Sequence, residues 1–586
     1  MHVLATILLA ATTATVPSPA PSPQLPVVPT VSPGYAAPGV SPPPPSVVGV
    51  TQQPFVGITL DTAIGMALSR NPDLAVAQAN RHIAQYQIES ARGAYDINFN
   101  IQPQYQYSES APQNAFFAGP NFGPIVQSGP SLNAGAQGIL PGGQQYNVNV
   151  SGRTIHDNTS INTFDPYYPT IFSVNFSQPL GRGRGINQAS RQLQLRQIAQ
   201  QSSNAQTLTT VSSTISQIQN TYWDLVAAWR NVAIQEQSLK DTIAQQHSNV
   251  RLARRGATAP IDVVQVNTQI AVFQQQVFSA LQNVAILQNQ LKSQLTTNAN
   301  DSIWNANLVP TSPILQPPSQ PALADLIMQA MRNRPELAQA RDQIRSAEVN
   351  IAYAQNQVKP QVNLQVGYTS NGFAGQLAPP GSFIQNSVTQ VVAINQLIAA
   401  VNRTLPPAQQ IPALPNQNQP VPTYLVGGLD QSIKNLLSNK FPVYAAGVLV
   451  SFPIGNHTAK ADLGAAIEQR RIAQIQEANA VQRIAMDVRD ALQGYQSSLA
   501  QLAAARTARE NSEQVLASEQ RRFRAGESTT YLVLQREIEL ADNRGRELQA
   551  QTSLNKAVVE LQRATGTILS ANNVNVTTVG EGALNQ

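Results

Sequence analysis

One passage of this chain occurs twice, and each copy changes from a strand-like pattern to a helical one at a hinge of proline and glycine. In the first copy, residues 171–200, apolar and polar side chains alternate as far as Ser177, and Pro179 and Gly181 follow. Such alternation is typical of a strand whose two faces meet different environments, and proline ends such a strand. The second copy, residues 444–474, repeats these residue types in register and ends on RRIAQ where the first ends on RQIAQ. Two hinges in register indicate a duplicated chain.

The segments before the hinges are duplicated too. Residues 60–107 and 323–370 align without a gap, and in each a short helical pattern restarts at a proline, Pro72 or Pro335. Proline suits the first helical position, where its missing N–H would have no partner in the helix. Each segment then becomes an alternating strand, whose apolar residues are Ile97, Phe99, Ile101, Tyr105 and Tyr107 in one copy and Val362, Leu364, Val366 and Tyr368 in the other. This pattern is expected of a water-filled transmembrane barrel, although a half-buried strand of a soluble sheet has it as well.

The two strands of each copy are separated by a stretch rich in Gly, Pro and Asn, which in the second copy covers residues 371–440. Long irregular stretches are expected of the outward-facing loops of a barrel. Tyr146, Val148 and Val150 alternate within the first stretch. We expect an extra strand or hairpin there, without a place in the topology, and we count four spanning strands in the chain.

A long helical tract without proline follows each hinge, at residues 187–252 and 457–523. At 1.5 Å per residue each would be roughly 100 Å long. Apolar residues three and four apart form a coiled-coil seam in each tract, and such a seam needs neighbouring helices. In the first tract the seam is Leu208, Val211, Ile215, Ile218, Tyr222, Leu225, Trp229 and Val232. We expect its Tyr and Trp residues to pack in the seam rather than to bind a ligand.

Each tract ends at a tip where arginine precedes glycine: Arg254 and Arg255 before Gly256, and Arg524 before Gly526. Arginine offsets the negative end of the helix dipole, and glycine adopts the left-handed backbone that ends many helices. A second helix is expected after each tip, at residues 261–294 and 530–565.

Composition excludes several classes of site. The chain has no cysteine, which removes disulfides, thiolate metal sites, cysteine nucleophiles and a lipid-modified N-terminal cysteine. Its five histidines are scattered, and a net charge of +5 without a Lys/Arg block gives no nucleic-acid footprint. The sequence GRGRG at residues 181–185 lacks the Lys-Ser/Thr of a phosphate loop, so we interpret it as a flexible loop. No catalytic residue, metal site or cofactor is therefore expected.

The N-terminal end contains an apolar run at residues 3–16, too short to span a bilayer as a helix and followed by Pro17. A signal peptide is expected at residues 1–20, although no Lys or Arg precedes the run and a mis-assigned start codon or an apolar tail is the alternative. No later apolar stretch reaches the length of a transmembrane helix, so a membrane crossing would use strands. The expected organisation continues with a Pro-rich disordered tether at 21–54, a first repeat at 55–320, a second repeat at 321–570 and a flexible tail at 571–586.

Over about residues 59–568 the chain resembles the TolC family of outer membrane efflux proteins. The resemblance rests on LDTAIGMALSRNPDLAVAQA and LADLIMQAMRNRPELAQAR, on SQPLGRGRG and SFPIGNHTAKA after a strand, on NTYWDLVAA and on the R-x-G tips. It implies a mainly α fold with transmembrane β: a trimer in which each copy gives four strands to a twelve-stranded β-barrel and its helices to a coiled periplasmic tunnel. Four strands cannot close a barrel alone, which agrees with several copies.

The resemblance also implies a function. The chain would be a passive export channel of the cell outer membrane, serving a tripartite efflux pump or a type I secretion system, in contact with outer membrane lipid. Its helical part would lie in the periplasm and would be opened by a periplasmic adaptor (membrane fusion) protein and an inner-membrane pump. It would not be an enzyme.

Particular residues follow from the resemblance. Arg254, Arg255, Gly256, Arg524 and Gly526 would form the tips that dock the adaptor. Asp262 matches a position that constricts the periplasmic pore in the family, although an acid at a helix N-terminus is equally expected there from the dipole. The second tip departs from the family pattern, because Leu532 and Gln535 stand where the archetype has an acidic pair.

Other classes of protein remain as alternatives. A non-membrane coiled-coil scaffold of the periplasm or envelope would have the same seams, with its strands paired in a soluble sheet. A porin is disfavoured by the large helical content, and an enzyme by the lack of a recognisable nucleophile, metal or phosphate site. The cargo, whether drug, metal ion, polypeptide or polysaccharide, is left open.

Overall fold

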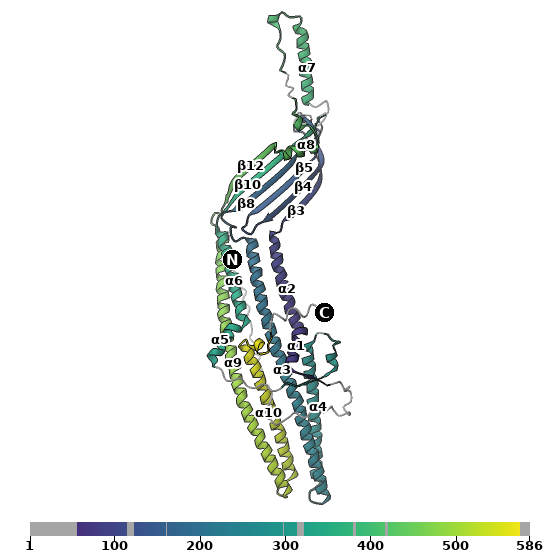
Figure 1. The fold of residues 1–586 in the computed structure, drawn as a ribbon, viewed down its shortest axis with the longest axis vertical. Coiled ribbons are helices and arrows are strands. Elements are labelled where there is room, and N and C mark those ends of the chain that lie inside the picture. Colours follow the sequence, from purple (N-terminus) through teal and green to yellow (C-terminus); the bar gives the residue numbers. More distant parts are fainter. Residues whose placement is uncertain are drawn as a thin grey trace, which may run out of the picture. The chain divides into compact units, whose positions relative to one another are not determined.

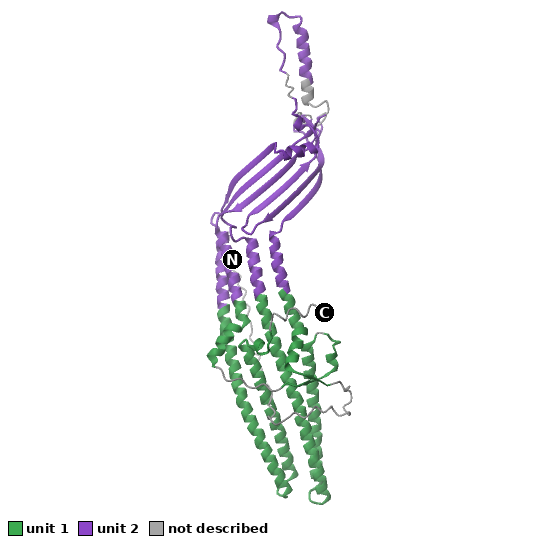
Figure 2. Cartoon of the chain, in the orientation of Figure 1, with its two compact units in different colours: residues 1–81, 202–340, 476–586 green, residues 82–201, 341–475 purple. Residues whose placement is uncertain are grey.

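The computed structural model describes residues 55–113, 122–159, 161–296, 298–312, 322–378, 383–415 and 420–574 of the 586-residue chain. The expected signal peptide and Pro-rich tether lie outside the described residues, as does most of the expected C-terminal tail. The chain forms two compact units, coloured separately in Figure 2. Unit 1 comprises residues 1–81, 202–340 and 476–586, and unit 2 comprises residues 82–201 and 341–475. Each unit takes segments from both sequence repeats.

The two repeats share six paired elements in the same order, as Figure 1 shows, and they differ between their paired strands. The paired helices before the strands are α1 (Leu60–Arg70) with α5 (Leu323–Asn333) and α2 (Pro72–Arg92) with α6 (Pro335–Val358). The paired strands are β3 (Asn98–Ser110) with β10 (Gln361–Gly372) and β8 (Thr170–Pro179) with β12 (Phe441–Ser451). The long helices are α3 (Gln188–Arg254) and α9 (His457–Arg524), followed by α4 (Pro260–Leu295) and α10 (Thr530–Ala564). The expected helix bounds are therefore correct to within two residues.

Unit 2 contains a seven-stranded sheet in which six strands follow one another in the order β12-β10-β8-β5-β4-β3. Every neighbouring pair is antiparallel. The seventh strand, β6 (His156–Asp157), pairs only with β4. The extra hairpin expected near Tyr146 is present: β4 (Ile125–Ile139) and β5 (Gln145–Arg153) lie between β3 and β8, so the sheet contains more strands than the four that were counted as spanning.

The stretch between β10 and β12 is also more ordered than an irregular loop. It contains β11 (Gly375–Leu377), which pairs with β7 (Phe164–Tyr167), the helices α7 (Phe383–Asn402) and α8 (Leu429–Leu437), and the short 3-10 helices η4 (Pro407–Gln409) and η5 (Thr423–Leu425). Helix α8 is tied to the end of the sheet. Ser370 donates to the carbonyl of Leu436 at 2.8 Å, and the hydroxyls of Thr170 and Ser432 lie 2.9 Å apart.

The hinge between β8 and α3 is held by one side chain of α6. Asn356 is buried; its Oδ1 accepts from the N–H of Gly183 at 2.6 Å, and its Nδ2 donates to the carbonyl of Arg184 at 3.1 Å. Gly183 and Gly185 have φ of +90° and +81°, values that favour glycine. The GRGRG loop is thus anchored at its centre, which corrects the interpretation of a flexible loop.

The core of unit 1 is built around the aromatic residues of α3. Tyr222 and Trp223 are fully buried among apolar residues of α1, α3 and α4. The Tyr222 hydroxyl donates to the carbonyl of Ile58 and accepts from the N–H of Ser312, both at 3.0 Å. These partners border a parallel pair of short strands, β2 (Phe55–Ile58) and β9 (Asn307–Pro310). The expected packing role is confirmed for the seam residues Tyr222 and Trp229: Trp229 is partly buried against the same core, and its indole N–H donates to the carbonyl of Leu308 at 2.9 Å.

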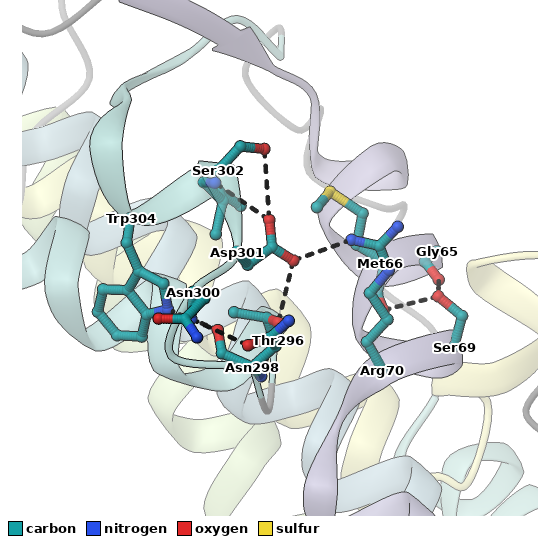
Figure 3. A network of polar contacts seen from close by, with 11 residues as sticks. Gly65, Met66, Ser69, Arg70, Thr296, Asn298, Asn300, Asp301, Ser302 and Trp304 are labelled. Carbon is teal, nitrogen blue, oxygen red and sulfur yellow. Dashed lines mark hydrogen bonds and ion pairs between the residues drawn. The ribbon is translucent and has the colours of Figure 1, made fainter. Parts of the chain in front are cut away.

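A polar network joins α1 to the segment after α4, as Figure 3 shows. Asp301 accepts from the N–H of Ile303 at 3.1 Å, from the hydroxyl of Thr296 at 3.1 Å and from the guanidinium of Arg70 at 3.2 Å. The hydrogen bond from Ile303, followed by those from the side chains, lowers the pKa of Asp301. The aspartate also caps the 3-10 helix η3 (Ser302–Asn305).

Helix α4 is long and apolar enough to cross a membrane by length and composition, the one such helix in the described part of the chain. This differs from the expectation that no such stretch follows the N-terminal run. Ala280, Val284 and Leu291 of α4 are nevertheless buried in the core that α1 and α3 share. Burial of this face makes α4 a packed element of unit 1.

Candidate functional site: the sheet faces and the helix tips

The six-stranded part of the sheet has one apolar face. Side chains of alternate residues share a face, so the strand register assigns each residue to one side. One row of cross-strand partners consists of Phe99, Ala136, Val148, Val174, Tyr368 and Tyr444. Phe99 is 68% and Tyr444 73% exposed. A contiguous exposed apolar surface of this kind marks contact with lipid or protein.

The opposite face carries amides on β3, β4, β5, β8 and β10, whereas β12 presents the apolar Val443 and Leu449 there. The neighbouring row of partners consists of Asn98, Gln137, Asn147, Asn175, Gly367 and Ala445, which line a hollow of about 750 Å³. Gly135 lies on this face between two asparagines: a Cβ there would lie 3.0 Å from Oδ1 of Asn100 and 3.1 Å from Oδ1 of Asn149. The expected apolar and polar alternation is confirmed, and it extends to β4 and β5.

The first tip joins α3 to α4 in unit 1. Gly256 has a φ of +70°, and the N–H groups of Gly256 and Ala257 donate to the carbonyls of Ala253 and Leu252 at 3.0 and 2.9 Å. These two bonds satisfy carbonyls at the end of α3 and form a Schellman motif. No neighbouring atom lies within 4 Å of a Cβ built on Gly256, so only the backbone angle requires glycine there.

The second tip repeats this geometry. Gly526 has a φ of +81° and open space around its Cβ position. Its N–H donates to the carbonyl of Phe523 at 3.1 Å, and the N–H of Glu527 donates to the carbonyl of Arg522 at 2.9 Å. The predicted left-handed glycines are therefore present at both tips. The arginines beside them, Arg254, Arg255 and Arg524, are exposed.

Asp262 lies in the first turn of α4, where its Oδ2 accepts from the N–H of Ala259 at 3.2 Å. This bond satisfies one of the N–H groups that a helix start leaves without a partner. Next to it, Ile261 is 59% and Val264 55% exposed. The first tip thus combines a capping carboxylate, exposed apolar side chains and arginines.

Sequence reasoning missed the carboxylate of the second tip. Glu527 directly follows Gly526 and is exposed, whereas the sequence analysis looked for acidic residues only at the positions of Leu532 and Gln535. The position of Glu527 immediately after the glycine of an R-x-G tip could have identified it in the sequence. The nearby Glu519 is buried and accepts from the hydroxyl of Ser528, so of these two glutamates Glu527 is the one on the surface.

One buried hydrogen bond connects the first long helix to α10 in unit 1, and a buried acid lies farther along α10. Nδ2 of Asn249 on α3 donates to the hydroxyl of Thr530, the first residue of α10, at 3.2 Å. Farther along α10, Glu537 is buried, and one of its carboxylate oxygens has no hydrogen-bond partner in the part of the chain that the structure describes. Burial, together with the negative charge of Asp241 on α3, raises the pKa of Glu537 to about 7.

Comparison with known proteins agrees with this fold. Residues 428–567 match the family model described as outer membrane efflux protein. No curated protein matches the chain by sequence. The resemblance found in the sequence motifs is therefore supported by a family model over this part of the second repeat.

Among solved structures, the CmeC outer membrane channel of Campylobacter jejuni has a TM-score of 0.57 at 12% identity, with 88% of this chain and 90% of that chain covered. The outer membrane protein VceC of Vibrio cholerae has a TM-score of 0.54 at 14% identity, with 86% of this chain and 96% of that chain covered. The MtrE outer membrane channel of Neisseria gonorrhoeae, in its open state, has a TM-score of 0.53 at 17% identity, covering 93% and 98%. At such identities the likeness is one of fold.

Proposed function

We propose that this chain, which has the fold of the outer membrane efflux channels and matches their family model over residues 428–567, is the outer membrane channel of an export system. The system would be a tripartite efflux pump or a type I secretion system. The observation that carries the proposal is the two-faced sheet, with an aromatic and aliphatic face on one side and an amide face on the other. A closed wall of such strands would set lipid against the first face and water against the second.

The edges of the sheet support assembly from several copies. Among the described residues, strands β3 and β12 each have a single neighbour in the sheet. Unpaired strand edges are not tolerated in lipid, so β12 of one copy would pair with β3 of the next. The resemblance to the family favours three copies. The expected total of twelve strands does not fit three copies of this sheet, since each chain brings six strands in a row.

The helical unit 1 would lie in the periplasm and end at the two tips. Arg254 and Arg255 at one tip and Arg524 at the other present cations, while Ile261 and Tyr531 present exposed apolar surface. Such a mixture of arginine with apolar and aromatic side chains is common at protein interfaces. A periplasmic adaptor would dock there, and an inner-membrane pump would supply the energy, because the channel itself is passive.

The test is the mass and location of the full chain expressed in a Gram-negative host. We expect it in the outer membrane fraction and, in detergent, at a protein mass near three times 63.0 kDa after the bound detergent is subtracted. A soluble scaffold would remain in the aqueous fraction. The exposed aromatic face of the sheet disfavours this alternative. A monodisperse monomer with full helical content would overturn the proposal.

A further inference from the structure

We infer that the β4–β5 hairpin is part of the membrane wall, so that three copies enclose an eighteen-stranded, amide-lined bore that admits wider neutral hydrophilic solutes than a twelve-stranded bore would. The inference rests on the proposed function and gives its pore a size and a lining. The total follows from six strands in each of three copies. Four properties of the hairpin support the inference: its position in the sheet, the length of its strands, the direction of its strands and the character of its two faces.

The hairpin lies inside the sheet rather than on it. Strand β4 pairs with β3 from Ile125 to Gln137, and β5 pairs with β8 from Gln145 to Gly152. Strand β4 has 15 residues and β5 has 9. A transmembrane strand needs about 9 to 11 residues, so both are long enough to span. A hairpin that served as a plug or an external loop would leave β3 and β8 paired with each other, whereas here both pair with the hairpin.

The strand directions explain how two strands can be added without disturbing the others. Every neighbouring pair in the row is antiparallel, so β3 and β8 run in opposite directions with the hairpin between them. Removing β4 and β5 together would leave β3 and β8 able to pair antiparallel, whereas removing one strand would not. A wall with four strands per copy can therefore become one with six by a single hairpin insertion.

The two faces of the hairpin match those of its neighbours. On the apolar side, Ala134, Ala136, Val148 and Val150 continue the surface that Phe99 and Val174 form on the flanking strands. On the other side, Gln137, Asn147 and Asn149 continue the amide surface of Asn98 and Asn175. A soluble loop would have no reason to keep an apolar side in register with that of the sheet.

The size of the bore follows from the strand number. Barrel diameter grows roughly linearly with the number of strands, so eighteen strands give a barrel about one and a half times as wide as twelve. In the six strands that form the row, the only charged residues are Glu109 and Arg153. Arg153 is the one whose register lies on the amide side, opposite Ser131, and it donates to Gln106 at 2.9 Å. The lining is thus of neutral amides on five strands and of neutral, mostly apolar residues on β12. Such a lining selects by size and offers hydrogen bonds, with little charge selection.

Single cysteines test the position of the hairpin, since the natural chain has none. Val148→Cys and Asn149→Cys are neighbours on β5 with opposite faces, and Val366→Cys and Gln365→Cys are the matched pair on β10. Each full-length variant is reconstituted in lipid vesicles and treated with a membrane-impermeant charged thiol reagent or with a lipid-soluble maleimide. We expect Asn149→Cys to react with the impermeant reagent at least tenfold faster than Val148→Cys, and the reverse order with the maleimide.

The pair on β10 separates the two proposals. If the two cysteines on β10 differ in reactivity as expected and the two on β5 do not, the hairpin lies outside the wall. This inference then fails, while the proposed channel stands. If neither pair alternates, the proposed function fails with it. If both pairs alternate, both hold.

The width is measured with neutral polymers of graded size that enter the open barrel from the external side and lower the single-channel conductance. The comparison is a variant in which residues 122–159 are replaced by a short Gly/Ser linker, leaving four strands per copy. We expect the cut-off radius of the full chain to exceed that of the variant by about one and a half times. Equal cut-offs would overturn the inference. If the shortened variant does not fold, the cysteine pairs still decide it.

Discussion

Asn71 and Arg334 occupy equivalent positions in the two repeats, and each donates a hydrogen bond to the end of the helix that returns from a tip. Nδ2 of Asn71 donates to the carbonyl of Gln294 at 2.9 Å, and a guanidinium N–H of Arg334 donates to the carbonyl of Ala564 at 3.3 Å. Both residues immediately precede a helix-starting proline. Each residue therefore connects the start of one helix to the carbonyl end of another. In the first repeat the end of α4 meets the start of α2, and in the second the end of α10 meets the start of α6.

The two joints differ in charge, which leads to a first prediction. Arg334 also pairs with Asp487 at 3.1 Å and Glu336 at 3.0 Å, and its side chain is nearly buried. Removing Arg334 leaves these two carboxylates, each about a third exposed, without their cation, at a cost of about 1.5–3 kcal/mol. We expect Arg334→Ala to lower the denaturation temperature of the assembled protein clearly, with Arg332→Ala, an exposed neighbour, as the control. Equal denaturation temperatures for the two variants would contradict the assignment.

The tip glycines provide the second prediction. Valine at Gly256 or Gly526 would have to adopt a positive φ, which costs roughly 1–2 kcal/mol in each turn. That is small against the stability of a large assembly, so the double variant should reach the outer membrane in normal amount. Export and adaptor binding should fall severalfold, because the shape of the tips changes. Ala257→Val and Ala525→Val place the same side chain beside each glycine, and they should export normally; a normal double glycine variant would locate docking elsewhere.

The third prediction compares the carboxylates of the two tips. If Asp262 lines the periplasmic mouth, Asp262→Asn should reduce the cation preference of single channels, and Glu527→Gln tests the second tip in the same way. Asp262 also caps α4, and asparagine keeps an oxygen that can accept from Ala259, so Asp262→Ala rather than Asp262→Asn should cost about 1 kcal/mol in stability. Reversal potentials measured in a salt gradient separate these roles. Unchanged reversal potentials in both Asp262 variants, with stability reduced in Asp262→Ala, would leave Asp262 a capping residue alone.

The fourth prediction concerns pH. Because the folded protein raises the pKa of Glu537 from 4.5 to about 7, the native state retains a proton that the unfolded chain has already lost between these two values. Native protein then binds more protons, so the free energy of unfolding decreases as pH rises from 4.5 to 7 and levels off above. The full change is about 3 kcal/mol for a shift of this size.

Glutamine resembles the protonated acid, so Glu537→Gln should remove this part of the pH dependence. Thermal denaturation of the natural chain and of Glu537→Gln is compared at pH 5 and pH 8, with Asp542→Asn, an exposed acid on the same helix, as the control. The natural chain and the control should lose stability between the two pH values by a similar amount, and Glu537→Gln should lose less. Three parallel curves would show that Glu537 ionises normally.

The sequence by itself determined the duplicated order of elements and the bounds of the helices. These depend on local causes: the 3.6-residue period of the seams, Pro72 and Pro335 at helix starts, and Gly256 and Gly526 at helix ends. Left-handed glycine after an arginine-rich turn is a property of a few consecutive residues, so it could be predicted before any partner was known. The alternation of β3 and β10 was equally local, and it indicated two different faces.

Only the tertiary structure decided where β4 and β5 belong. Tyr146, Val148 and Val150 alternate in the sequence as any strand does, but a period of two does not say which strand will be its neighbour. The insertion between β3 and β8 depends on hydrogen bonds between segments distant in the sequence, such as Val148 opposite Val174. The same holds for Asn249 with Thr530 and for Glu537 near Asp241, because these contacts exist only once α10 has packed along α3. Pairing and burial are non-local, and for that reason the strand number and the buried acid could not be predicted from residue patterns.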